Sequence, residues 1–327
     1  MAGVGPLAVV RIPRTGAGAV SRAISSNYTR VETVGKYQQD PLKARGTLEA
    51  LASNPELQAV GGPVPFGLFL RHLPRDTRYI TILRDPVSRV YADYCMRGPA
   101  GEEAGPSARK RLRTSWESIL NAARIERDGH NEGPEITLED DADLSLEAGL
   151  ARKVPIYVNL MTRFLWGGEG LFGELPPDAL GRAKENLDRF WFVGLAERLD
   201  DCIVLLGRRL GVGAPMPYGS RGVNEHGPGE DGAAPQLREL IAEHNALDLE
   251  LYRYARERFE ETAPSPDELA QETDELRQRS IQLSAVKATK KTAARTAKLT
   301  AKSARLAAKN EASAAKRARQ ADSGQDA

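Results

Sequence analysis

Leu7 to Arg22 read L-A-V-V-R-I-P-R-T-G-A-G-A-V-S-R, and the fold can be built outward from this stretch. Its first four residues are apolar and include two valines, as expected of a buried β-strand. A turn containing Gly16 and Gly18 follows, and Ala19 to Ile24 have the pattern of a helix. A strand, a glycine-containing turn and a helix in this order direct backbone N–H groups and the positive end of a helix at an anion. The stretch therefore predicts an anion-binding loop, or equally a connection of the same shape that binds nothing.

The residues of the turn are of the kinds that an anion-binding loop would use. Arg14 adds a fixed positive charge, and Thr15 adds a hydroxyl donor. The small residues at 16 to 19 would let a phosphate or sulfate group approach the backbone closely.

A second basic residue follows a second predicted strand. Arg78 to Leu83 are rich in β-branched and aromatic residues and lead directly into Arg84-Asp85-Pro86. Asp85 is a favourable N-cap and Pro86 a favourable first helical residue, so a helix is expected to start there. Ligands of open α/β sheets bind at the carboxyl ends of the strands, so Arg84 is expected to converge with Arg14 on one polyanion.

Strands alternate with helices along the remaining body, which predicts a mainly parallel sheet covered on both faces. A short strand or loop is expected within 61–67 and a third strong strand at 190–195. The expected helices lie at 68–72, 144–166 in two pieces, 177–189, 200–210 and 237–261, and a variable surface insertion with a short helix near 116–125 is expected at 98–143.

Composition limits the class of protein. Two cysteines, Cys95 and Cys202, and four histidines are too few and too scattered for a structural zinc site. No apolar run approaches the roughly 18 residues that span a bilayer, and a signal sequence is not evident. These features predict a cytoplasmic protein without a structural metal.

The charge is distributed unevenly. Residues 277–327 hold 13 Lys and Arg against three acids, which gives +10, so residues 1–276 carry 1 − 10 = −9. We expect a domain at 1–265 and a basic tail at 266–327 that is disordered or loosely helical, because it has no aromatic residue and little apolar surface. A solvated extension, or binding to nucleic acid or an anionic surface, would each suit such a tail.

Several ordered blocks resemble a known family. R-I-P-R-T-G-A-G resembles the H-I-P-K-T-G-G-T loop of the family-2, carbohydrate-type sulfotransferases, which include the heparan sulfate 2-O-sulfotransferases. Y-I-T-I-L-R-D-P-V-S-R-V-Y resembles their second signature, a strand followed by L-R-D-P-x-x-R and a helix. Further similar blocks, in the same order, lie at 61–68, 159–167, 192–201 and 244–252.

The resemblance implies a P-loop-like sulfotransferase fold and transfer of a sulfuryl group from 3′-phosphoadenosine 5′-phosphosulfate (PAPS) to a hydroxyl of a carbohydrate or glycosylated small molecule. It implies that the 5′-phosphosulfate is held by Arg14, Thr15, Gly16, Ala17 and Gly18. Arg14 stands where the family has a catalytic lysine, and Arg84 would bind the 3′-phosphate as a fork. No metal is implied, and the acceptor and the oligomeric state stay open.

Five positions depart from the family's pattern. Arg14 replaces lysine, and Ala17-Gly18 replaces Gly-Thr. Ala92 stands where the family has a serine for the 3′-phosphate, and Pro63 stands where many members have the Gly-His pair that supplies the base. His226 is one alternative base. The alternative function is a protein of this fold that binds a nucleotide or polyanion without transfer; a P-loop kinase would need a Gly-Lys-Ser/Thr sequence that this loop lacks.

Overall fold

One parallel sheet organises the chain. The computed structural model describes residues 5–97 except 36 and 38, residues 106–129, 145–219 and 232–289, and the single residues 292, 293, 296 and 300. All strand pairs are parallel, and the order is β2-β3-β1-β4-β5. The strands are β1 (Leu7–Val10), β2 (Val31–Thr33), β3 (Ala59–Gly62), β4 (Arg78–Leu83) and β5 (Phe192–Leu195). The predicted α/β class with a parallel sheet is confirmed.

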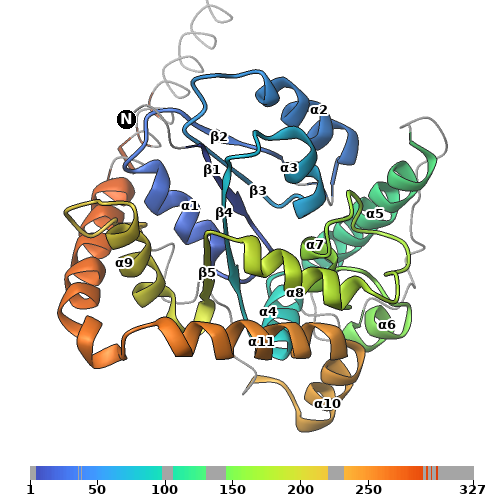
Figure 1. Cartoon of the computed structure of the whole chain (residues 1–327). Helices are drawn as coiled ribbons and strands as arrows, with labels where there is room; N and C mark the ends of the chain where they lie inside the picture. Colours follow the sequence, from blue (N-terminus) through green and yellow to red (C-terminus); the bar gives the residue numbers. More distant parts are fainter. Residues whose placement is uncertain are drawn as a thin grey trace, which may run out of the picture.

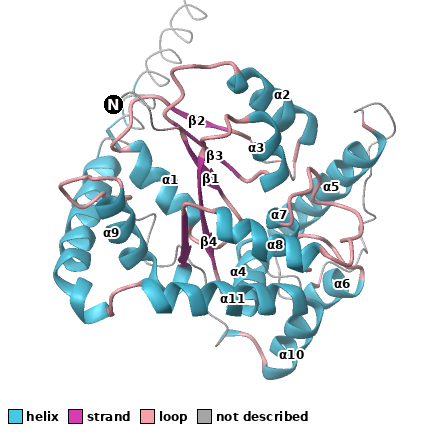
Figure 2. Ribbon diagram, in the orientation of Figure 1, coloured by secondary structure: helices cyan, strands magenta, loops and turns pink. Residues whose placement is uncertain are grey.

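Helices cover both faces of this sheet. Figure 1 shows α1 and α9 on one side of the strands and α3, α7 and α8 on the other, and Figure 2 shows how few strand residues there are among the helices. The helices on the first side are α1 (Ala17–Ser25) and α9 (Leu199–Arg209). The other labelled helices are α2 (Pro41–Ala52), α3 (Phe66–His72), α4 (Pro86–Arg97), α5 (Pro106–Asp128), α6 (Leu146–Ala151), α7 (Leu160–Leu165), α8 (Ala179–Arg189), η1 (Ala196–Arg198), α10 (Pro235–His244) and α11 (Ala246–Thr262). An unlabelled helix at 266–289 follows α11.

The inner strands are apolar, as expected where both faces of a sheet are covered, whereas the edge strand β2 contains the exposed residues Glu32 and Thr33. All four residues of β1 are buried, and so are the last five of the six residues of β4. β1 lies at the centre of the sheet between β3 and β4. The loops that follow β1 and β4 therefore leave the same edge of the sheet from neighbouring strands, as the sequence predicted.

β3 shows why two glycines can form a central strand. A Cβ atom on Gly62 would lie 2.8 Å from Cβ of Val34, and one on Gly61 would lie 3.1 Å from Oγ of Ser21. A side chain at position 62 would clash with the backbone and Cβ of Val34, whereas one at position 61 would require the Ser21 side chain to shift by a few tenths of an ångström. The residues Gly61 and Gly62, where only a loop or short strand was expected, thus complete a strand that starts at Ala59.

Two helix predictions were wrong in extent. The helix expected near 116–125 is the 23-residue α5, whereas residues 98–105 and 130–144 of the predicted insertion lie outside the described part. The single long helix expected at 237–261 is broken at Asn245, which separates α10 from α11.

The break at Asn245 has a clear physical cause. The Nδ2 group of Asn245 donates hydrogen bonds to the carbonyl oxygens of Tyr157 and Ile241, at 2.8 and 2.9 Å. Its Oδ1 accepts from the backbone N–H of Asn159 at 2.9 Å, and Asn159 Oδ1 in turn accepts from the N–H groups of Leu247 and Asp248. The two asparagine side chains thus bind the starts of α7 and α11 to each other, in the manner of N-caps.

The tail prediction was wrong for its first part. Residues 266–289 form a helix, and Leu269 and Leu276 on it are fully buried in the main core. Figure 1 shows this orange to red helix lying beside α9. The expectation that residues after 265 bury no core surface fails because these leucines, with Thr273 and Ser280, recur every three or four residues on one face.

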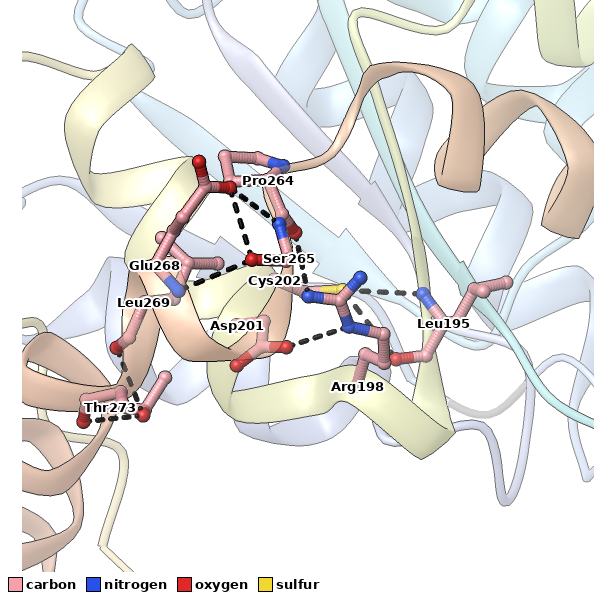
Figure 3. A network of polar contacts seen from close by, with 10 residues as sticks. Leu195, Arg198, Asp201, Cys202, Pro264, Ser265, Glu268, Leu269 and Thr273 are labelled. Carbon is pink, nitrogen blue, oxygen red and sulfur yellow. Dashed lines mark hydrogen bonds and ion pairs between the residues drawn. The ribbon is translucent and has the colours of Figure 1, made fainter.

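The start of this helix is fixed by a capping box, seen in Figure 3. The backbone N–H of Ser265 donates to Glu268 Oε2 at 2.8 Å, and the N–H of Glu268 donates to Ser265 Oγ at 3.4 Å. Arg198 secures the same junction, since it donates to the Pro264 carbonyl oxygen at 2.9 Å and pairs with Asp201 at 2.7 Å. The sequence S-P-D-E at 265–268 is the signal that would have predicted this helix start.

Candidate functional site

The loop after β1 is a tight turn with two left-handed residues. Arg14 has φ 69° and Gly16 has φ 87°. The left-handed region suits glycine but costs a residue with a Cβ roughly 1–2 kcal/mol. A left-handed residue other than glycine persists where the surrounding structure fixes the backbone, and such residues cluster in functional loops.

Thr15 is used inside this turn. It is fully buried, and its hydroxyl donates to the Ile12 carbonyl oxygen at 2.9 Å. The sequence predicted this hydroxyl as a donor to a ligand, whereas the structure places its proton on the protein backbone. Thr15 therefore stabilises the shape of the loop.

Arg84 joins the loop to the next strand. One of its Nη1 protons is donated to the carbonyl oxygen of Arg14 at 3.2 Å, and the residue is only 5% exposed. Burial lowers the pKa of the Arg84 guanidinium, while the nearby carboxylates of Glu197 and Asp85 act in the opposite direction. Arg14 and Arg84, which were predicted to converge, thus meet through a hydrogen bond from the Arg84 side chain to the Arg14 carbonyl oxygen.

Arg14 pairs with a residue that the sequence did not single out. Its Nε donates to Oδ1 of Asp93 on α4 at 3.2 Å, and the Asp93 side chain is 2% exposed while that of Arg14 is 25% exposed. Asp93 lies beside Ala92, which occupies the family's serine position. An acid among the apolar positions of the predicted helix, next to Val90 and Tyr94, is the signal that could have revealed it.

The helix start after the loop has the features that attract an anion. No side chain caps α1, and its first turn contains no acid. Ala17 and Gly18 form that first turn, and Gly16 is its N-cap. By contrast, Asp85 occupies the start of α4, where its Oδ1 accepts from the Ser88 N–H at 2.7 Å. Of these two helix starts, only that of α1 is without a side-chain cap, so its backbone N–H groups are the ones that an anion could contact.

A further basic group lies beneath α1. Arg11 directly follows β1, and burial together with the neighbouring charge of Arg22 lowers its pKa. Within the described part of the chain, Arg11 makes no hydrogen bond or ion pair, and the buried Ser21 Oγ has no hydrogen-bond partner. Arg22 donates from Nε to the Tyr218 carbonyl oxygen at 3.0 Å. The sequence placed Arg11 in the quoted stretch but assigned it no role.

The remaining predicted positions divide into two groups. Pro63 and Ala92 are buried and offer no side-chain base or hydroxyl, and His226 lies outside the described residues. Arg163 is a structural residue, since its guanidinium donates to the carbonyl oxygens of Val158, Leu171 and Gly173. No general base is evident among the described residues next to the loop.

Comparisons with known proteins leave the family open. No protein-family model matches the chain, and no curated protein matches it. In the part of the chain that the structure describes, no group of three or more His, Cys, Asp or Glu side chains is arranged to hold a metal ion. None of the described helices is long and apolar enough to cross a membrane.

Proposed function

We propose that this chain is a PAPS-dependent sulfotransferase of the P-loop-like fold, acting on a hydroxyl of a carbohydrate or glycosylated small molecule. The observation that carries the proposal is the loop 11–16 with its left-handed turn and uncapped helix, tied by Arg84 to the neighbouring strand. An anion at the start of α1 would meet backbone N–H groups, a helix dipole and two arginines from one sheet edge.

Each residue of this site would have its own role in binding PAPS. The backbone N–H groups of residues 16–18 would hold the 5′-phosphosulfate, and Arg14 would stabilise charge developing on the leaving phosphate. Arg84 would bind the 3′-phosphate as a fork. In the reaction the S–O bond to the phosphate breaks, a bond to the acceptor oxygen forms, and the hydroxyl proton must pass to a base.

A second function is favoured by two specific contacts. Arg14 is paired with Asp93, and the Thr15 hydroxyl is bonded within the turn, so two groups assigned to the reaction already have protein partners. Pro63 offers no base. The same site would then bind a nucleotide or another polyanion without transferring a group.

Calorimetric titration with adenosine 3′,5′-bisphosphate, the product nucleotide, tests both functions. Micromolar binding is expected in the native chain and a loss of at least about tenfold in Arg84→Met, because a charged hydrogen-bond donor is removed. Arg182→Met is the matched control, since Arg182 is half exposed on α8 and pairs with Asp178. Thermal unfolding of both variants separates lost binding from lost folding.

Transfer of radiolabelled sulfate from PAPS to a panel of sugars then separates the two functions. Turnover lost in Arg14→Met supports the transferase, and nucleotide binding without turnover on any acceptor supports the binding protein. Absence of nucleotide binding in the folded native chain contradicts both.

A further inference from the structure

A groove of about 690 Å³ lies beside β5, which is an edge strand of the sheet. The C-terminal parts of α9 and α11 line it, and both helices contact β5 (Figure 1). Its volume is within the range of about 300–1,000 Å³ that is typical of ligand sites. The loop of Arg14 follows the carboxyl end of a strand, whereas Phe190 and Trp191 of the groove precede β5. The groove is therefore a separate site.

The backbone of Val193, in the lining of this groove, faces away from the rest of the sheet. Successive residues of a strand direct their N–H and C=O groups alternately to its two sides. The N–H of Leu195 donates to Cys202 Sγ at 3.3 Å, and this thiol donates to the Leu195 carbonyl oxygen at 3.5 Å (Figure 3). Leu195 thus faces α9 and not β4, so Val193, two residues earlier, faces the same side.

The hydrogen bonds of β4 lead to the same direction for Val193. The N–H of Arg78 donates to the Pro6 carbonyl oxygen at 2.9 Å, on the side of β1, so Thr81 faces β5. Thr81 lies opposite Val193 in the register. In a parallel pair, a residue that faces its neighbour bonds to the two residues that flank its opposite partner, and that partner faces away. No side chain or loop in the described part of the chain bonds to the backbone of Val193.

A free strand edge of this kind can pair with another extended chain. The shape of the groove limits what that chain can be, since Leu205 of α9 and Phe259 of α11 both line it. A single extended segment fits beside a strand that lies between two helices. The edge of a second sheet, which carries helices on its own two faces, does not. The groove therefore favours a peptide segment over β5 of a second copy of this chain.

The positive charge around Trp191 indicates the chemistry of the segment. The guanidinium groups of Arg78 and Arg209 lie 4.9 and 4.7 Å from the centre of the Trp191 ring. Arg78 donates to the Gly5 carbonyl oxygen at 3.3 Å, and neither arginine forms an ion pair in the part of the chain that the structure describes. An acidic side chain in the groove would thus meet two cations that have no carboxylate partner.

The acids of the lining have a different arginine as their partner. Asp188 accepts from the Tyr254 hydroxyl at 2.7 Å and from Arg258 at 2.5 Å. Glu261, the other acid of the lining, follows Arg258 by three residues on α11 and is its neighbour on the helix surface. Around the groove three arginines therefore face two acids, and the surplus positive charge lies at Trp191.

From these observations we propose that the free edge of β5 binds an extended acidic peptide segment of another protein as an added strand. The backbone of the segment pairs with Val193, an acidic side chain lies beside Arg209, and apolar side chains pack on Leu205 and Phe259. This inference does not depend on the proposed sulfotransferase activity, because the groove is separate from the loop of Arg14.

Selection of phage-displayed random heptapeptides on the full chain supplies a probe, and fluorescence anisotropy of the recovered peptide measures its affinity. Recovered peptides are expected to combine Asp or Glu with β-branched or aromatic residues. Methylation of each backbone N–H of the peptide in turn is expected to weaken binding by at least about tenfold at alternate positions, and much less at the positions between them. An added strand directs only every second N–H to its neighbour.

Two variants of the protein connect the probe to this groove. Arg209→Met is expected to lose about three- to fivefold in affinity, as for an exposed ion pair, whereas Arg256→Met is expected to change it by less than about twofold. Arg256 is the matched control because it is exposed on α11 and lies outside the groove. Val193→Pro removes the free N–H and is expected to abolish binding, while thermal unfolding checks that the edge strand tolerates proline.

The proposal is overturned if no recovered peptide binds the folded chain, or if Arg209→Met and Arg256→Met have equal effects. Equal effects of methylation at every position of the peptide also overturn it, and these readouts hold even where Val193→Pro does not fold. Sedimentation velocity of the full chain tests the other occupant of the edge. A dimer that Arg209→Met weakens and Arg256→Met does not would place a second copy in the groove, against the proposal.

Discussion

Arg84 donates a hydrogen bond to the main-chain carbonyl oxygen of Arg14 at 3.2 Å, across 70 residues of sequence. The contact joins the ends of β4 and β1, which are neighbours in the sheet. It also explains how a residue with a side chain is held at φ 69°, because the donor fixes the direction of the Arg14 carbonyl group. The conformation of the loop thus depends on the adjacent strand.

The left-handed turn predicts opposite effects for two nearby glycines. Gly16→Ala is expected to destabilise the protein by about 1–2 kcal/mol, because Gly16 has φ 87° and a Cβ is strained there. Gly18→Ala is expected to be neutral or to stabilise by up to about 1 kcal/mol, because Gly18 is helical and its Cβ would meet only Arg22 Nη1 at 3.6 Å. Urea unfolding measures both, and equal effects would contradict the turn geometry.

The pairing of Arg14 with Asp93 predicts that one carboxylate limits anion binding. Asp93→Asn removes a negative charge next to the loop but keeps an oxygen that accepts from Arg14 Nε. The affinity for adenosine 3′,5′-bisphosphate is expected to rise about three- to tenfold at low salt, since the net field at the loop becomes more positive. Titration calorimetry measures this, and Asp178→Asn at the exposed N-cap of α8 is the control.

Weaker binding by Asp93→Asn would show instead that the charge of Asp93 positions Arg14 for its ligand. In that case the double variant Arg14→Met, Asp93→Asn is expected to be no weaker than Arg14→Met alone.

The start of α7 predicts a pH-dependent effect on stability. Asp248 is fully buried and accepts from the N–H groups of Met161 and Thr162 and from the Thr162 hydroxyl. Burial raises the pKa of Asp248, and the positive charge of Arg89 opposes that rise. Asp248→Asn replaces one acceptor with a donor and removes a buried negative charge that interacts with Arg89, so a loss of about 2–4 kcal/mol is expected near neutral pH.

The sign of the pH dependence follows from the raised pKa. Between the unfolded and folded pKa values of Asp248 the folded state binds more protons, so its contribution to stability falls as the pH rises from about 4. The difference in unfolding free energy between the native chain and Asp248→Asn should therefore shrink as the pH rises through that window. A difference that grows with pH would contradict it, and urea unfolding at several pH values measures it.

The features that the sequence predicted correctly are those that depend on residues close together in the chain. β4 starts and ends at the predicted residues, and Asp85 caps α4, because an apolar run and a capping residue act over a few positions. The meeting of Arg14 and Arg84 followed from the parallel order of the strands. The sequence did not predict the partners of Arg14 and Thr15 within the protein. Asp93 lies 79 residues from Arg14, and the hydrogen bond of Thr15 to Ile12 depends on the fold of the turn.

Long-range packing explains the errors in the helices. No local signal in 237–261 indicates that Asn245 will bond to Tyr157 and Asn159, yet these bonds break the helix. The charged composition of 266–327 suggested a tail without a core, whereas Leu269, Thr273, Leu276 and Ser280 bury one face of this helix. A spacing of three or four residues was the signal for that face, and the high charge content of the segment obscured it.

The helix 266–289 predicts the last pair of effects. Leu276→Ala is expected to destabilise the protein by about 2–5 kcal/mol, because Leu276 is fully buried in the main core. Ile281→Ala on the same helix is expected to change stability by less than about 0.5 kcal/mol, because Ile281 is 58% exposed. Thermal and urea unfolding of the full chain measure both. If the two variants were equally stable, the helix would not be part of the core; a selective loss in Leu276→Ala would place the domain boundary after it, well beyond residue 265.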